Sequence, residues 1–217
     1  MALNKLKYNC LNLPPAANKA IGFDSDADAL EATLGAGAMT FIKKLTASSS
    51  SDLSFVNGAS DVVLDSTYKE YMFICNNIHA SAQEYFSFNF RDGSTDYDAT
   101  KTTTHFYSYH NEAGNSNGIS YTAGYDLAQG TGFQRIGDNL DIDNDHSLSG
   151  TLHLFNPSST TFVKHFLGTI QFNSTNGQST NSFVAGYCNT TTAIDAVQFK
   201  MTSGNIDSGT ITLYGIN

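Results

Sequence analysis

Three carboxylates, Asp141, Asp143 and Asp145, have the spacing that could bind a metal ion. Carboxylates at positions i, i+2 and i+4 open calcium loops, because hard cations take six or more oxygen ligands. An EF-hand would also need glycine and glutamate at the positions where this chain has His146 and Leu152. The segment is therefore a calcium candidate outside the EF-hand class, and a solvated acidic loop is the alternative.

Two histidines, His153 and His165, lie in neighbouring apolar runs that predict a β-hairpin. If the strands pair with Leu152 opposite Phe166, the two imidazoles face each other. A facing pair could share a metal ion or change charge near neutral pH. Zinc sites need three or four protein ligands, and the neighbouring residues supply no third one. A half-buried pair at a sheet or subunit surface is the alternative.

Tyrosines gather in the loop-rich middle of the chain. Aromatic rings combine an apolar face with a polar tip, so an exposed set could bind a glycan or a protein partner. A subunit interface or ordinary amphipathic packing is the alternative. The candidate residues for surface recognition are Tyr107, Tyr109, Tyr121 and Tyr125.

No nucleophile elbow, P-loop, HExxH motif or dinucleotide fingerprint occurs in the sequence. Active sites normally leave such a motif or cluster, so we expect no enzymatic activity and no cofactor apart from the calcium candidate. The carboxylate pair of a glycosidase is defined only in space. A glycan-degrading enzyme that uses acids such as Glu84, Asp92, Asp96 or Asp98 therefore stays open as a less favoured alternative.

The strands that must position these residues are clearest in the second half of the chain. Apolar residues recur at every second position in 147–156 and again in 161–173, separated by the turn-forming segment 156–159. We expect a long hairpin whose apolar face is covered by a second sheet. That face would carry Leu148, Leu152, Leu154, Phe162, Phe166, Ile170 and Phe172.

Short apolar runs alternate with Gly, Asn, Asp and Ser turns from residue 40 onward, which is typical of all-β proteins. The run 209–216 is apolar on both parities, so it predicts a strand with neighbours on both sides. We predict an antiparallel two-sheet sandwich of jelly-roll type over residues 41–217. Its expected strands are 40–46, 52–56, 60–64, 68–78, 83–91, 101–110, 118–123, 131–136, 147–156, 161–173, 181–188, 193–202 and 209–216.

Residues 1–40 differ in composition from the rest and predict a short N-terminal arm. A stiff Leu13-Pro14-Pro15 segment precedes a stretch, 24–34, that could form one short helix. Terminal arms stay disordered unless something holds them. We therefore expect this arm to serve attachment or oligomerisation, with a surface arm packed on the domain as the alternative.

Charge and composition exclude several classes of protein. The net charge is −9, from 20 acidic and 11 basic residues, and no basic cluster offsets it, so we expect no nucleic-acid binding. The three cysteines lack CxxC spacing and predict neither a zinc site nor a disulfide framework. No signal peptide and no apolar stretch long enough to insert in a membrane is recognisable. We expect synthesis in a reducing cytosol and release by lysis.

Several long segments resemble a protein family of marine tailed bacteriophages, including those of cyanobacteria. They are STYKEYMFICNNIH (66–79), DLAQGTGFQRIG (126–137), DNDHSLSGTLHLFNPSSTTFVKHF (143–166) and FVAGYCNTTTAIDAVQFKMTSGNIDSGTITLYGI (183–216). The segment 17–50 is similar to the entry segment of the same proteins. Together they cover most of the chain.

This resemblance implies a virion structural protein of the tail-fibre-like type and brings no catalytic or ligand residue with it. An arm of about 40 residues leaves no long shaft, which favours a compact knob, tip or decoration. We expect a homotrimer that binds other virion proteins and contacts a host-surface glycan or outer-membrane protein. A capsid or tail decoration protein without receptor binding is the alternative.

Overall fold

The computed structural model describes residues 20–23, 30–33, 38–175 and 177–217. The chain divides into two units, Met1–Ala38 and Met39–Asn217. In the first unit, β1 (Ala20–Phe23) pairs antiparallel with β2 (Leu30–Thr33). The helix expected over 24–34 is therefore wrong for residues 30–33, and residues 24–29 lie outside the described part. A helix this short is marginal alone, whereas a strand partner satisfies the backbone.

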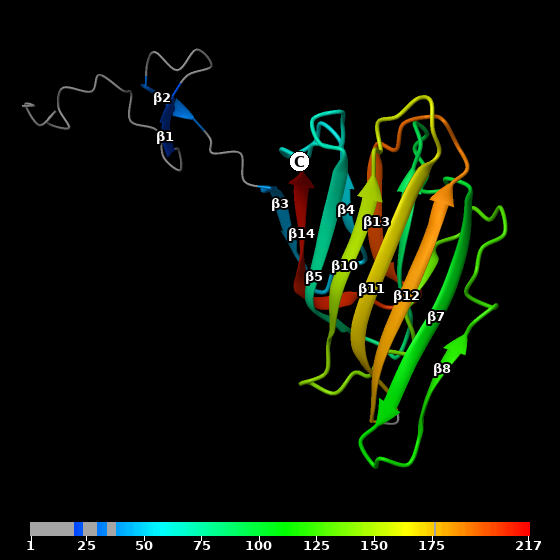
Figure 1. The fold of residues 1–217 in the computed structure, drawn as a ribbon. Helices are drawn as coiled ribbons and strands as arrows, with labels where there is room; N and C mark the ends of the chain where they lie inside the picture. The colour runs from blue at the N-terminus through cyan, green and yellow to red at the C-terminus, as the bar shows by residue number, and fades with distance from the viewer. Residues whose placement is uncertain (1–19, 24–29, 34–37, 176) are drawn as a thin grey trace, which may run out of the picture. The chain divides into compact units, whose positions relative to one another are not determined.

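In the second unit, an eight-stranded and a four-stranded antiparallel sheet pack face to face (Figure 1). The larger sheet has the order β3 (Met39–Thr46), β14 (Ile206–Ile216), β5 (Glu70–Ala80), β10 (Leu148–Phe155), β11 (Lys164–Ser174), β12 (Gln178–Cys188), β7 (Lys101–Asn111) and β8 (Asn117–Tyr121). The smaller sheet has the order β4 (Leu53–Val56), β13 (Ala196–Met201), β6 (Phe86–Arg91) and β9 (Gln134–Gly137).

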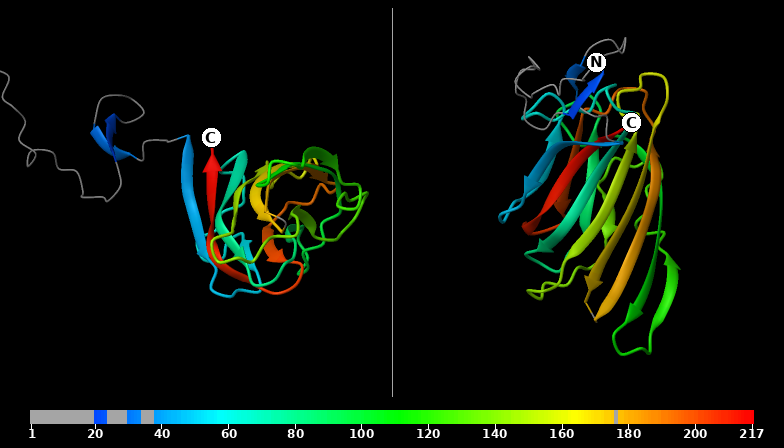
Figure 2. Two further views of the ribbon diagram at one scale, coloured as in Figure 1. Left: turned by 90° about the horizontal axis from the view of Figure 1, so that it is seen from below. Right: turned by 60° about the vertical axis from the view of Figure 1, so that its left-hand side comes forward.

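This architecture confirms the all-β two-sheet sandwich, while the jelly-roll type stays a prediction. Figure 2 shows the larger sheet curving around the smaller one. The predicted strand 209–216 is confirmed with neighbours on both sides, because β14 lies between β3 and β5. No helix within the described ranges is long and apolar enough to cross a membrane.

Aromatic side chains fill the space between the two sheets. Phe199 of β13 lies at the centre, with its ring centroid 5.5 Å from that of Phe73 and 5.9 Å from that of Phe86. Both Phe55 and Phe88 also lie against it, and all five side chains are almost completely buried. Strand alternation explains this layer, since every second residue of each facing strand points inward.

The predicted hairpin is present as β10 and β11, but its register differs by two residues. Leu152 pairs with Gly168, and Leu154 pairs with Phe166. A shift by two keeps the parity of every side chain, so the expected apolar face is buried. The exception is Phe162, which is 70% exposed because it lies in the connecting loop before β11 begins.

The connecting loop is longer than the sequence suggested. Asn156 adopts a left-handed φ of 47°, and the Ser159 amide donates to its carbonyl oxygen over 3.0 Å. The Ser159 hydroxyl in turn accepts the amide of Phe162. These bonds stabilise a broad turn. The second strand therefore begins only at Lys164.

The strand predicted at 60–64 is wrong. Ser60 and Asp61 have φ values of 50° and 66°, which an extended strand does not allow. Val62 and Leu64 are nevertheless buried, so their apolar character reflects the core rather than a strand.

Candidate functional site

Five apolar side chains lie on the solvent-facing side of the larger sheet, and we call them the outer face cluster. They project from β7, β8, β11 and β12, on the side of the sheet opposite to the buried residues of β7, β11 and β12. Three of them are more than half exposed: Ile119 at 79%, Tyr121 at 61% and Leu167 at 52%. The cluster consists of Phe106, Ile119, Tyr121, Leu167 and Phe183.

Strand register brings these residues side by side. Tyr121 pairs with Phe106, and Phe106 pairs with Phe183 on the next strand. The Phe106 and Phe183 rings stack with centroids 4.8 Å apart and planes 11° from parallel. Two shallow depressions lie on the same strands. Thr104 and Leu167 line both of them, and Phe166 lines one. These residues therefore form one exposed apolar patch on the larger sheet.

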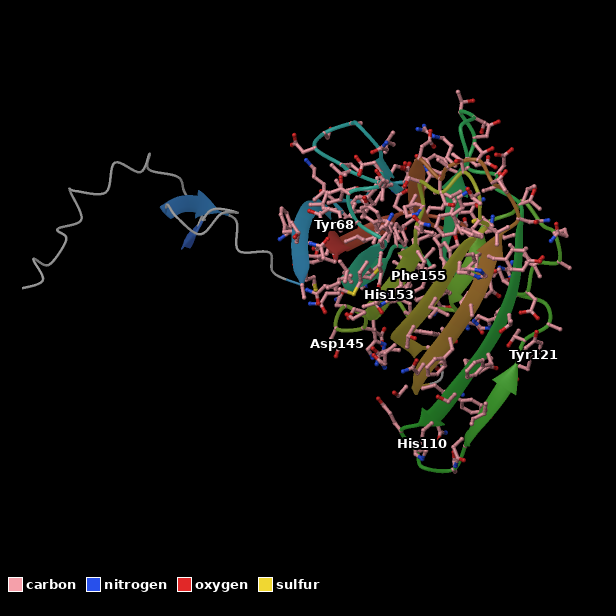
Figure 3. All side chains as sticks on the ribbon, turned by 45° about the horizontal axis from the view of Figure 1, so that its top comes forward. Tyr68, His110, Tyr121, Asp145, His153 and Phe155 are labelled. Carbon is pink, nitrogen blue, oxygen red and sulfur yellow. The ribbon has the colours of Figure 1, made fainter. Side chains whose placement is uncertain are left out.

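The four candidate tyrosines do not form one surface. Tyr121 belongs to the outer face cluster, and Figure 3 shows it on β8. Tyr107 and Tyr109 lie on the opposite side of β7, the side that carries the buried His105. The Tyr125 hydroxyl donates to Asp138 over 2.9 Å, which holds that side chain in its loop.

The acidic loop brings together a different triad from the one expected. Asp141, Asp143 and His146 each offer a ligand atom, and these atoms lie within 4.8 Å of one another. The side chain of Asp145 is 90% exposed. Nδ1 of His146 lies 3.3 Å from an Asp141 carboxylate oxygen, so two of the three groups are already close to each other. An imidazole nitrogen is also a poor calcium ligand, and the calcium site stays a prediction.

The two candidate histidines do not face each other. Because the register differs by two residues, His153 pairs with Leu167, while His165 pairs on its other side with Tyr187. Nδ1 of His153 lies 2.5 Å from the carboxylate of Glu70, and its ring centroid lies 6.4 Å from that of Phe155. Figure 3 labels both His153 and Phe155. The expected facing pair is therefore wrong.

No family model, no curated protein and no solved structure matches this chain. The outer face cluster was not recognised from the sequence, although a signal for it exists. Leu167 and Phe183 alternate with the buried Phe166 and Val184, so they had to lie on the opposite side of their strands.

The buried His105, on the side of β7 opposite to the outer face cluster, predicts a pH dependence of stability. His105 is 1% exposed, and its Nδ1 has no hydrogen-bond partner among the residues that the structure describes. Burial lowers the pKa of His105 below its ordinary value, and the charge of Asp126 opposes that shift. The unfolded state therefore binds a proton more readily. We expect stability to fall as the pH drops below about 6.5.

The test compares melting temperatures between pH 5 and pH 8 for the wild type and His105→Gln. In His105→Gln the melting temperature is expected to fall less between pH 8 and pH 5 than in the wild type. His110→Gln, at the exposed end of β7, is the matched control and should keep the full slope. Equal slopes in all three proteins would contradict the assignment to His105.

Proposed function

We propose that this chain is a structural protein of a tailed-phage virion, an appendage domain that assembles as a homotrimer through its outer face cluster. The observation that supports self-association is the stacked and exposed apolar row of that cluster. The virion context is supported by the sequence resemblance and by the acidic, hydroxyl-rich composition. Other virion proteins would hold the N-terminal region.

The proposed host contact lies at the end of the sandwich away from Met39. The β7–β8 hairpin lies at that end (Figure 1). Its turn is rich in amides: Asn111 Nδ2 donates to Asn115 Oδ1 over 2.7 Å, and both side chains are at least partly accessible. Amide groups donate and accept hydrogen bonds, which suits recognition of a glycan or of an outer-membrane protein.

The first test is the native mass of the full chain by light scattering. We expect a mass near three chains for the wild type and near one chain for Leu167→Glu, because a buried, unpaired carboxylate opposes association. Thr95→Glu adds the same charge in an exposed loop and should remain trimeric. A wild-type monomer, or a trimeric Leu167→Glu protein, would contradict self-association through this face. Repeating the measurement with a chelator tests the calcium prediction.

The second test separates the appendage from its alternatives. Fluorescently labelled protein is expected to decorate host cells. Docking on capsids or tails without cell binding would favour a decoration protein instead. Release of reducing ends from host polysaccharide would favour a glycan-degrading enzyme.

A further inference from the structure

A completely buried lysine contacts a completely buried asparagine on the side of β6 that faces away from the aromatic core. Lys101 opens β7 in the larger sheet, and Asn89 lies on β6 in the smaller sheet. Nζ of Lys101 contacts Oδ1 of Asn89 and donates to the carbonyl oxygen of Ala99 over 2.7 Å. Within the described part of the chain, no salt bridge joins Lys101 to a carboxylate.

The surrounding backbone fixes the orientation of the asparagine amide. Nδ2 of Asn89 donates to the carbonyl oxygens of Tyr97 and Thr131, the latter over 3.0 Å. Because only the NH₂ group can donate to these carbonyls, Oδ1 must face the lysine. The Phe90 amide also donates to Oδ1 over 2.8 Å. The side-chain carbonyl is therefore held and polarised beside an amine.

A permanent charge at this position would be costly. Burial lowers the pKa of Lys101 to about 8, although the charges of Asp98 and Asp92 oppose that shift, so about a tenth of the amine is neutral at pH 7. Cys188 pairs with Lys101 across β7 and β12, but burial raises the pKa of its thiol to about 12, so it remains neutral. The Cys188 side chain therefore does not compensate an ammonium group at Lys101. Conversion of the Lys101 amine into an amide would remove the charge altogether.

We infer that Lys101 and Asn89 form an intramolecular isopeptide bond that links the two sheets. The neutral amine attacks Cγ of Asn89, and a new C–N bond forms while the carbonyl electrons move onto Oδ1, where the Phe90 amide donates. The C=O bond then re-forms and the Cγ–Nδ2 bond breaks. Nδ2 takes the proton that Nζ loses and leaves as ammonia. The step needs neither an oxidant nor a cofactor.

Lys164 provides an internal comparison. It is as completely buried as Lys101 and pairs with the same Cys188 from the other side. Among the residues that the structure describes, its Nζ donates only to backbone carbonyls, those of Thr190 over 3.1 Å and Thr192 over 2.6 Å. It therefore has the burial of Lys101 without a side-chain amide to attack.

The test is the intact mass of the denatured full-length protein, followed by mass spectrometry of its tryptic peptides. We expect a mass about 17 Da below that of the sequence, the mass of ammonia. Trypsin does not cleave after an acylated lysine, so a branched peptide should join 70–91 to 92–135. Lys101→Met and Asn89→Ala should restore the full mass, and Lys164→Met should keep the deficit.

Two results would overturn the link. The first is a wild-type protein of full mass after prolonged incubation at pH 8–9, where at least about half of the amine is neutral. The second is a deficit that persists in Lys101→Met without a branched peptide, because an asparagine that cyclises onto its own backbone also loses ammonia. Circular dichroism of each variant shows whether it is folded. If Lys101→Met does not fold, the branched peptide of the wild type decides alone.

Discussion

Replacing Phe199 by alanine is expected to lower the free energy of unfolding by about 3–5 kcal/mol. The Phe199 ring contacts aromatic rings from both sheets, among them Phe73 of the larger and Phe86 of the smaller. Its loss would leave a cavity where the sheets meet, and close packing allows little collapse around it. An effect of this size is a large share of the stability of most domains.

Urea unfolding followed by fluorescence or circular dichroism measures the change. Phe162→Ala removes the same ring from a loop position that is 70% exposed, and it should change the free energy by less than about 0.5 kcal/mol. Similar losses in the two variants would show that Phe199 is not the centre of the core. A Phe199→Ala protein that is not recovered in folded form would agree with the prediction.

Gly209→Ala is expected to destabilise the protein by about 3 kcal/mol or more. Gly209 has a φ of 108° at a register shift between β14 and β5. A Cβ atom there would lie 2.4 Å from the carbonyl oxygen of Asn77, which is backbone and cannot move aside easily. The substitution therefore combines an unfavourable backbone conformation with a direct clash.

Gly58→Ala separates these two contributions. Gly58 also has a positive φ, 77°, but a Cβ atom there would meet nothing within 4 Å. Its substitution should cost only about 1–2 kcal/mol, the strain of the left-handed conformation. Equal effects at the two positions in the same urea experiment would argue against the close approach at Gly209.

Hydrophobic periodicity was sufficient to predict which residues form the core of the hairpin. Leu148, Leu154 and Phe166 are completely buried as expected, because parity depends only on counting by two. The same argument cannot distinguish registers that differ by two residues. The true register depends on the hydrogen bonds of the loop after Asn156, which the sequence does not specify.

The outer face cluster and the buried polar contacts of β6 were less predictable, because both depend on contacts between strands that are distant in the sequence. Ser87 and Asn89 alternate with phenylalanines, a pattern that indicates a polar, solvent-facing side of the strand, yet both are completely buried. The Ser87 hydroxyl donates to the carbonyl oxygen of Lys200, and Nδ2 of Asn89 donates to that of Thr131, both far along the chain. Alternation within one strand separates its two sides but does not reveal what covers the second side.

The pairing of Met39 with Ile216 determines how the sandwich would carry a mechanical load. These residues lie side by side at one end of β3 and β14. Tension applied between Met39 and Ile216 would separate β3 from β14 from that end, breaking one hydrogen bond at a time. Tension between Met39 and the distal β7–β8 hairpin would instead act along the strands and load many hydrogen bonds together. The domain would therefore withstand a larger force when it is pulled between Met39 and the β7–β8 hairpin than when it is pulled between Met39 and Ile216.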